Sequence, residues 1–422
     1  DINGDRTQPN FKPDYSPDLL LAHNYITHLV AVRRQLCIDA GGLRPEYDGA
    51  QDYDLLLRLT DDKNRVVHHI PEVLYHWRQS ASSTSLHPNV KPTAEKHAQL
   101  ALMETLARRN IDGLVESAGR PHFFHVRRQL TNETLSIVIP FKDHPSLLRQ
   151  CIESILSKTT HQEYEIIAIS NNSDSPETFA LMDELARRDS RLTFYECNVP
   201  FNFSALINFG VQKAQGTHIT SINSDVELIS WNWAEALMAH TQRPEVGVVG
   251  GKLYFPDNTI QHAGIVVGIN GYAGHAHKGR HCNDDGYFHR ANLIQNISAV
   301  TGAFMMFRKT LFEQMDGFDE SYPVACNDID FCLRVREHGF LNIFTPYAEA
   351  YHHESSTRGY EDSMSTRERF NREVGRFRTR HKQIIESGDP YYNVNLSLLS
   401  EDFEIRDTLR HTYDKTLSRQ PT

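Results

Sequence analysis

Residues 135–140 (LSIVIP) and 164–170 (YEIIAIS) decide the fold that the sequence predicts. Each is a short apolar run, rich in β-branched residues, that ends at a proline or a polar turn, as expected of a strand buried on both faces. Between them, residues 146–156 carry apolar side chains at helical spacing. The order strand, helix, strand therefore predicts two parallel strands joined by a crossover helix.

The same alternation continues along the chain. A polar turn, a helix that reaches Arg188, a strand at 192–195 and a strand at 217–222 follow. Fully apolar strands alternating with helices predict an α/β fold with a mostly parallel sheet, flanked by helices on both faces.

Ligands of such sheets bind beyond the carboxyl ends of the strands. The loops 141–144 and 171–174 and the tripeptide 223–225 (NSD) are expected at that edge. The first strand is not followed by a GxGxxG sequence, which disfavours a dinucleotide site.

Length and composition set further bounds. A chain of 422 residues has room for two domains, and 39% hydrophobic residues indicate an ordinary globular protein. The 44 basic and 54 acidic residues give a net charge of −10, which argues against a nucleic-acid surface. The six cysteines form no CxxC pair, which argues against a zinc site and a disulfide framework and favours a reducing cytoplasm. The sequence predicts no transmembrane segment and is compatible with peripheral association at a membrane.

One pattern of charged residues occurs twice. Each copy has Asp-x-Asp, an arginine six residues after the first aspartate, and a Tyr-His pair whose histidine lies 24 residues after it. The two sets are Asp52, Asp54, Arg58 and His76, and Asp328, Asp330, Arg334 and His352. The chain therefore contains a duplicated unit.

Only about fifty residues precede the first Asp-x-Asp, so the first copy has no room for the nucleotide-facing strands. We expect a partial domain at 1–112, a linker at 113–134, a complete domain at 135–360, and a helical extension with a polar tail at 361–422. Because the chain opens at Asp1 in a polar stretch, we also expect it to be a fragment of a longer protein.

Three side chains are candidates for chemistry. Asp225 follows a buried strand, where its carboxylate could ligate Mg²⁺ or Mn²⁺; a plain turn is the alternative. His352 is a candidate metal ligand, favoured over His353 because the first copy has Trp77 at the latter place. Asp328 is a candidate general base, whereas Asp330 has a structural partner four residues later.

In order, these motifs are SIVIPFKD, EIIAISNNS, INSDVEL, VTGAFMMFRK, GFDESYPVACNDIDFCLRVREHG and AYHHESSTRG. Together, over 135–359, they resemble the inverting family 2 glycosyltransferases of the GT-A fold. The resemblance implies that Asp225 belongs to the metal-binding Asp-x-Asp motif, that Asp328 is the catalytic base and that His352 is a further metal ligand.

The resemblance also implies a set of donor-binding residues. These are Pro140, Lys142, Asn171 and Asn172 near the nucleoside, Asn223 and Ser224 in the Asp-x-Asp motif, and Gly302 near the donor sugar. Asn223 departs from the motif, because it keeps an oxygen ligand but loses a charge. In the first copy, Asp52 and His76 match the acceptor side of a second, vestigial site.

The resemblance implies a metal-dependent transferase that moves a hexosyl or deoxyhexosyl group from a nucleotide-diphospho-sugar to a saccharide or lipid-linked saccharide. With its two copies, the chain is similar to bacterial proteins that carry two GT-A domains in tandem and build O-antigen or capsule. The resemblance therefore implies a location in the cytoplasm or at the inner face of the plasma membrane. Two alternatives stay open. A sugar nucleotidyltransferase would need a glycine-rich, basic loop after the first strand, and a non-catalytic carbohydrate-binding or scaffolding module would show no donor turnover.

Overall fold

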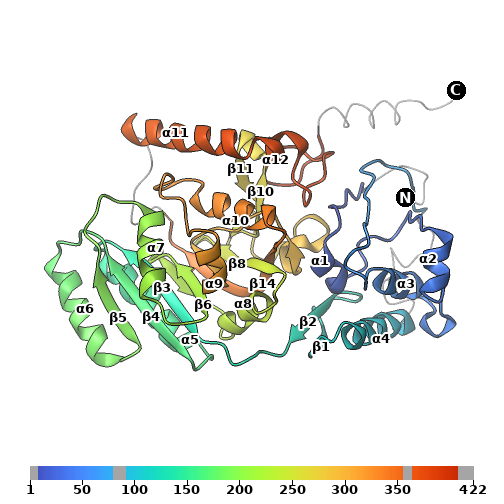
Figure 1. Ribbon diagram of the computed structural model, residues 1–422, viewed down its shortest axis with the longest axis horizontal. Helices are drawn as coiled ribbons and strands as arrows, with labels where there is room; N and C mark the ends of the chain where they lie inside the picture. Colours follow the sequence, from blue (N-terminus) through green and yellow to red (C-terminus); the bar gives the residue numbers. More distant parts are fainter. Residues whose placement is uncertain (1–7, 79–91, 355–363, 407–422) are drawn as a thin grey trace.

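The computed structural model describes residues 8–78, 92–354 and 364–406 of the chain. Its largest feature is one mixed sheet in the order β12-β14-β8-β13-β6-β3-β4-β5, with β7 paired to β14 and β9 to β8 (Figure 1). The strands of this sheet are β3 (Leu135–Phe141), β4 (Tyr164–Ser170), β5 (Leu192–Glu196), β6 (His218–Ile222), β7 (Val226–Leu228), β8 (Val246–Tyr254), β9 (Ile260–His262), β12 (Gln295–Asn296), β13 (Phe304–Arg308) and β14 (Leu341–His352).

The first half of the sheet is parallel, as predicted. β3 pairs in parallel with β4 on one side and β6 on the other, and β4 pairs in parallel with β5. Every residue of β3 and β6 is buried, which fits the apolar run at 137–141 in β3, whereas β6 also buries the polar residues His218, Thr220 and Ser221. The predicted strands therefore lie where the sequence placed them, and the α/β class is confirmed.

Helices cover both faces of this half. Alternate residues of β3 belong to different layers: Val138 packs against α7, and Ile137 lies in the core that residues of α5, α6 and α8 share on the other face. The helices of this domain are α5 (Pro145–Lys158), α6 (Pro176–Arg188), α7 (Phe203–Lys213), α8 (Trp233–Thr241), α9 (Lys309–Gln314) and α10 (Asn327–Glu337).

The second half of the sheet is mixed. β13 runs antiparallel between β6 and β8, while β14 pairs in parallel with β8. β14 is broken in register between Phe344 and Glu349, around the proline at 346. A small second sheet joins β10 (Ile265–Val267) to β11 (Ala273–His275).

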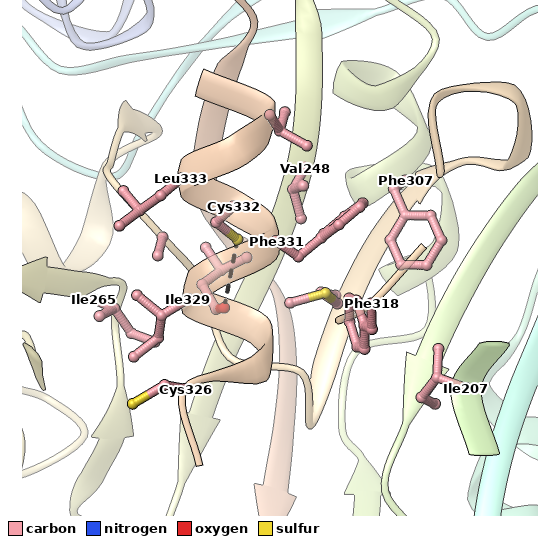
Figure 2. Close-up of a cluster of buried hydrophobic side chains, with 14 of the residues drawn as sticks. Ile207, Val248, Ile265, Phe307, Phe318, Cys326, Ile329, Phe331, Cys332 and Leu333 are labelled. Carbon is pink, nitrogen blue, oxygen red and sulfur yellow. Dashed lines mark hydrogen bonds between the residues drawn. The ribbon is translucent and has the colours of Figure 1, made fainter. Parts of the chain in front are cut away.

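Helix α10 rests on an aromatic cluster (Figure 2). Phe307 of β13, Phe318 and Phe331 lie with ring centroids 5.1 to 6.5 Å apart. Offset and edge-on aromatic contacts of this kind fix ring orientation beyond the effect of burial alone. The cluster therefore holds the N-terminal end of α10 against the sheet.

The N-terminal residues form a smaller unit with its own core. It contains α1 (Pro17–Ala22), α2 (Arg34–Asp39), α3 (Gln51–Leu59), α4 (Pro92–Arg108), β1 (Gly113–Ser117) and β2 (Phe124–Arg128). Residues 113–134, which we expected to be a plain linker, therefore carry an antiparallel hairpin. The alternating apolar residues Val115, Phe124 and Val126 bury one face of it in this core.

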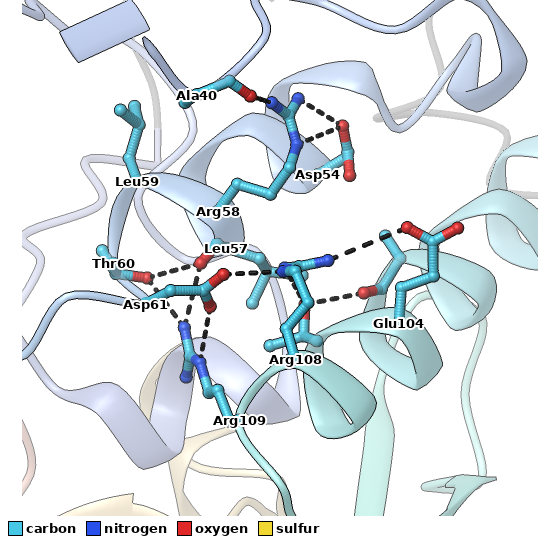
Figure 3. A network of polar contacts seen from close by, with 12 residues as sticks. Ala40, Asp54, Leu57, Arg58, Leu59, Thr60, Asp61, Glu104, Arg108 and Arg109 are labelled. Atoms are coloured by element: carbon cyan, nitrogen blue, oxygen red, sulfur yellow. Dashed lines mark hydrogen bonds and ion pairs between the residues drawn. The ribbon is translucent and has the colours of Figure 1, made fainter.

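The duplicated unit has the same contacts in both copies. Arg58 ion-pairs with Asp54 and donates hydrogen bonds to the carbonyl oxygens of Ala40 and Gly42, the latter at 2.7 Å (Figure 3). Arg334 ion-pairs with Asp330 and donates to the carbonyl oxygens of Met315 and Gly317, the latter also at 2.7 Å. Arg58 thus ties α3 to the turn that follows α2, and Arg334 ties α10 to the turn that follows α9.

The C-terminal residues pack back on the large domain. α11 (Met364–Arg380) and α12 (Lys382–Ser387) follow, as the charged helical pattern predicted. The expected polar tail is packed as far as residue 406, because Tyr392, Leu396 and Phe403 bury against Phe11. No helix within the described ranges is long and apolar enough to span a bilayer.

We predict that Asp330→Ala destabilises the protein strongly. The carboxylate is fully buried and contacts Arg334, His381 and Arg380, so its removal takes the ion-pair partner from the largely buried Arg334 and a hydrogen-bond partner from the buried His381 ring. Removing one partner of a buried pair costs roughly 3–5 kcal/mol of unfolding free energy, measurable by urea denaturation. Arg188→Ala, which removes an exposed pair with Glu153, should cost less than about 1 kcal/mol; equal losses would contradict the structural role of Asp330.

Candidate active site

The carboxyl ends of three parallel strands meet at one edge of the sheet. Phe141 pairs with Ser170 across β3 and β4, and β6 runs in the same direction beside β3. The loops after these strands, at 141–144, 171–174 and 223–225, therefore lie along one edge, as the sequence predicted.

Asp225 and His352 come together there, although 127 positions separate them in the sequence. β6 ends at Ile222, a turn follows, and β7 begins at Val226. The end of β14 pairs with β7, with His352 opposite Val226. This register brings His352 Nε2 to 3.2 Å from Asp225 Oδ1.

Gln261 orients the His352 ring. Its Oε1 lies 2.7 Å from His352 Nδ1, and its amide nitrogen lies 3.2 Å from Glu354, so Oε1 is the atom that accepts. Nδ1 therefore carries a proton, and in a neutral ring Nε2 has a free lone pair facing Asp225. Two acceptors 3.2 Å apart repel each other unless a proton or a metal cation lies between them.

Asn223 completes this group. Its Nδ2 is 3.5 Å from His352 Nε2, and its Oδ1 is buried without a hydrogen-bond partner among the described residues. An orphaned buried amide oxygen beside a carboxylate and an imidazole suits a divalent cation, which takes oxygen and imidazole ligands. Within the described ranges no three His, Cys, Asp or Glu side chains form a metal cluster, so this donor set depends on the amide.

His353 has a different partner. Its Nε2 lies 3.2 Å from Glu227, which also accepts a hydrogen bond from Gln150. This pairing agrees with the preference for His352 as the candidate ligand.

Asp328 lies at the N-terminal end of α10. Its Oδ2 accepts a hydrogen bond from the Gly302 amide at 2.7 Å, and its Oδ1 accepts one from the Ile329 amide at 2.8 Å. Burial raises the pKa of Asp328 above the ordinary value of a carboxyl, while these hydrogen bonds oppose that shift. A carboxylate with a raised pKa is a stronger base, which suits proton abstraction.

Gly302 links Asp328 to the Asp225 turn. Its amide donates to Asp328, its carbonyl oxygen accepts from Ser221 Oγ at 2.8 Å, and the next residue's carbonyl accepts from the Asn223 amide at 3.1 Å. A β-carbon on Gly302 would lie 3.2 Å from the Phe203 ring and 3.3 Å from the Asp328 β-carbon. Glycine therefore lets the chain pass close to these two side chains.

The remaining predicted donor residues lie at the same edge with mixed roles. Pro140 is buried in β3, Lys142 is exposed just beyond it, and Ser224 is partly buried in the turn before β7. The amides of Asn171 and Asn172 donate to the carbonyl of Val199 at 2.9 and 2.7 Å. These two side chains therefore anchor the loop after β5, and contact with a nucleoside stays a prediction.

Sequence reasoning missed several residues near this site. Gln261 gave no signal, because its role depends on a three-residue strand. His275 lies in β11, and its Nδ1 is 2.9 Å from His262 Nδ1. Burial lowers the pKa of His275 to about 3, and it lowers that of His262 strongly as well, so both rings are neutral.

In the first copy, the matching residues are not brought into such a site. Asp52 accepts a hydrogen bond from Asn24 Nδ2 at 3.1 Å near the start of α3. His76 is exposed in a segment without regular structure. Their assignment to a vestigial site stays a prediction.

Residues 136–316 match the sequence model of glycosyl transferase family 2. This segment belongs to that family. The matched segment contains Asp225 and Gly302 and ends before Asp328 and His352. The mixed sheet with one parallel half agrees with the GT-A fold that the resemblance implied.

Two curated relatives are similar to almost the whole chain. An uncharacterized protein of Sinorhizobium fredii (strain NBRC 101917 / NGR234) is 41% identical over 95% of this chain and 44% of its own length. The O-antigen biosynthesis protein RfbC of Myxococcus xanthus is 36% identical over 98% of this chain and 32% of its own length. The chain thus spans less than half of either relative.

Among solved structures, the mannosyltransferase PcManGT from Pyrobaculum calidifontis, in complex with GDP-Man and Mn²⁺, has a TM-score of 0.44 and 14% identity. The similarity covers 60% of this chain and 65% of that one.

We predict that the stability gained by Asp328→Asn grows with pH. Because the folded-state pKa is raised, the native state holds this proton more tightly than the unfolded chain does. This tighter proton binding stabilises the folded wild type. The stabilisation is complete below the unfolded-state pKa of about 3.9 and is lost as the pH rises through the folded-state pKa of Asp328. The melting temperature of the variant relative to the wild type should therefore increase between pH 4 and pH 8.

The matched control is Asp183→Asn, which changes an exposed carboxylate on α6. Its melting temperature relative to the wild type should not follow this trend. A difference for Asp328→Asn that stays flat or falls with pH would contradict the raised pKa.

Proposed function

We propose that the family 2 domain transfers a sugar from a nucleotide-diphospho-sugar to a hydroxyl group of a saccharide or lipid-linked saccharide, with inversion at the anomeric carbon. The observation that carries the proposal is that two aspartates, Asp225 and Asp328, lie near each other at one edge of the sheet. Asp225 lies with His352 and Asn223, and Asp328 is joined to that turn through Gly302. Such a transfer needs a cationic centre for the leaving diphosphate and a base for the acceptor.

Asn223, Asp225 and His352 would hold a divalent cation, Mg²⁺ or Mn²⁺. The fit rests on the orphaned Asn223 oxygen, the atoms of Asp225 and His352 that face each other, and the Gln261 contact that engages His352 through Nδ1, so that Nε2 points into the group. When bound, such a cation neutralises negative charge that develops on the departing nucleoside diphosphate. With Asn223 in place of a carboxylate, the site has one charge fewer, and we expect it to bind the cation more weakly than an Asp-x-Asp pair would.

Asp328 would act as the general base. Its carboxylate is held by two backbone amides, so its position does not depend on a flexible side chain. In a single displacement it takes the proton of the acceptor hydroxyl as that oxygen bonds to the anomeric carbon and the bond to the diphosphate oxygen breaks. No covalent enzyme intermediate forms, and the anomeric configuration inverts.

We further propose a role in bacterial surface polysaccharide synthesis. The support comes from a relative named as an O-antigen biosynthesis protein and from shorter similarities to proteins named as rhamnosyltransferases. A hexosyl or deoxyhexosyl donor would fit that role.

We predict that Asp328→Asn lowers kcat for sugar transfer about 10²- to 10⁴-fold, the usual contribution of a general base. Asparagine has nearly the same shape but cannot accept the proton. The measurement is sugar transfer by the purified protein, with circular dichroism to confirm the fold. Asp316→Asn, which changes a carboxylate in the turn after α9, serves as the matched control. Near-normal transfer by folded Asp328→Asn would contradict its role as base.

We predict opposite effects from two changes in the Asp225 group. Asp225→Asn should weaken Mn²⁺ binding and transfer together, because it removes the remaining carboxylate of the turn. Asn223→Asp should tighten Mn²⁺ binding, because it adds a charge beside His352. Titration calorimetry with Mn²⁺ measures both. Unchanged Mn²⁺ affinity in both variants, or full activity after exhaustive EDTA treatment, would remove these residues from the proposed site.

A further inference from the structure

The first copy of the duplicated unit exposes a segment that is a central strand in the second copy. Residues 29–33 correspond to β13, aligned through Gly42 and Gly317. Phe304 in β13 is fully buried, whereas Leu29 at the matching position is 69% exposed. The apolar side chains of Val30 and Val32 are exposed as well.

A second segment shows the same contrast. Residues 65–76 correspond to β14, aligned through Asp52 and Asp328. Leu74 is 58% exposed, whereas Ala350 at the matching position is fully buried. Around Leu74, the exposed apolar side chains include Val66, Val67, Ile70, Val73, Tyr75 and Trp77.

The backbone of these segments is also unpaired. Neither segment is in a strand, and within the described residues the amides of 29–33 and 66–73 donate no hydrogen bond. Apolar side chains over unpaired backbone amides are what a strand presents when its sheet is absent.

The rest of the unit is already in its final arrangement. The contacts of Arg58 with Asp54, Ala40 and Gly42 match those of Arg334 in the complete domain. Asp52 is the second residue of α3, as Asp328 is the second residue of α10. The helical layer and the carboxylate are therefore in place, and only the sheet is missing.

From these contrasts we propose that residues 29–33 and 65–76 complete the sheet of a second transferase site. The partner is a donor-side half-domain that carries strands equivalent to β6 and β8, located elsewhere in the longer natural polypeptide. Asp52 and His76 would serve in that site as Asp328 and His352 do in the first. The chemistry assigned to Asp52 rests on the proposed function of the family 2 domain, whereas the strand pairing does not.

The structure favours this partner over a second copy of the chain. β13 uses both of its edges, one for β6 and one for β8, so a matching segment needs a partner in which those two strands are free. In this chain both are already paired with β13. The curated relatives are more than twice as long as the matched region, which leaves room for a further half-domain.

Hydrogen exchange tests the pairing without an activity assay. The amides of 29–33 and 66–76 should exchange rapidly in the 422-residue chain and at least about 10²-fold more slowly in the full natural polypeptide, because pairing in a sheet protects amides. Equal, rapid exchange in both proteins would overturn the proposal. The proposal would also be overturned if these amides were protected in the 422-residue chain and lost that protection on dilution. That result would mean that a second copy of the chain pairs with them.

Product analysis of the full polypeptide tests the second site. Asp52→Asn should reduce one of two transfer products about 10²-fold or more, as loss of a general base does. Asp48→Asn, an exposed carboxylate in the preceding turn, is the matched control. If the amides are protected but Asp52→Asn alters no product, the pairing holds and the second activity is wrong. If Asp328→Asn alters no product either, the proposed function itself fails.

Discussion

The pairing of β13 with β6 on one edge and β8 on the other is the constraint on which the domain depends. It joins the parallel half of the sheet to the half that carries β14. It also fixes the short link at 301–303, whose Gly302 holds Asp328 on one side and Ser221 on the other. Without β13, nothing in the sheet would join the part that carries Asp225 to the part that carries Asp328.

The candidate site concentrates negative charge where the proposed phosphate-bearing donor would bind, and this charge alone would oppose donor binding. Asp225 and Asp328 both lie at the edge, in a chain of net charge −10. A cation held by the proposed ligands would resolve this conflict locally, because its charge would act at short range and the net charge of the chain has little effect there. The neutral, buried histidines His262 and His275 add no competing positive charge to this region.

The sequence predicted the parallel half of the sheet well, because a strand such as 164–170 is buried at all but one position and carries an unbroken apolar run at 166–169. It also predicted the structural role of Asp330, because an i, i+4 ion pair is visible in a linear sequence. The contact of His352 with Asp225 followed from resemblance, whereas the role of Gln261 depends on how a short strand packs beside β8 and leaves no local signal. The hairpin at 113–128 was missed because its strands, GLVES and FHVRR, bury few positions and carry charged residues, so they lack the apolar runs that marked β3 and β4.

The most direct test of the central claim is a thermal-shift panel of nucleotide-diphospho-sugars, with and without Mn²⁺, on the wild type and Asp225→Asn. A ligand that binds only the folded state at a hundred times its Kd stabilises it by about 2.7 kcal/mol, which raises the melting temperature. We expect at least one donor to raise the melting temperature of the wild type in a Mn²⁺-dependent way, and Asp225→Asn to lose that shift. No shift with any nucleotide-sugar, in a folded protein supplied with Mn²⁺, would contradict the assignment of this sheet edge as a donor site.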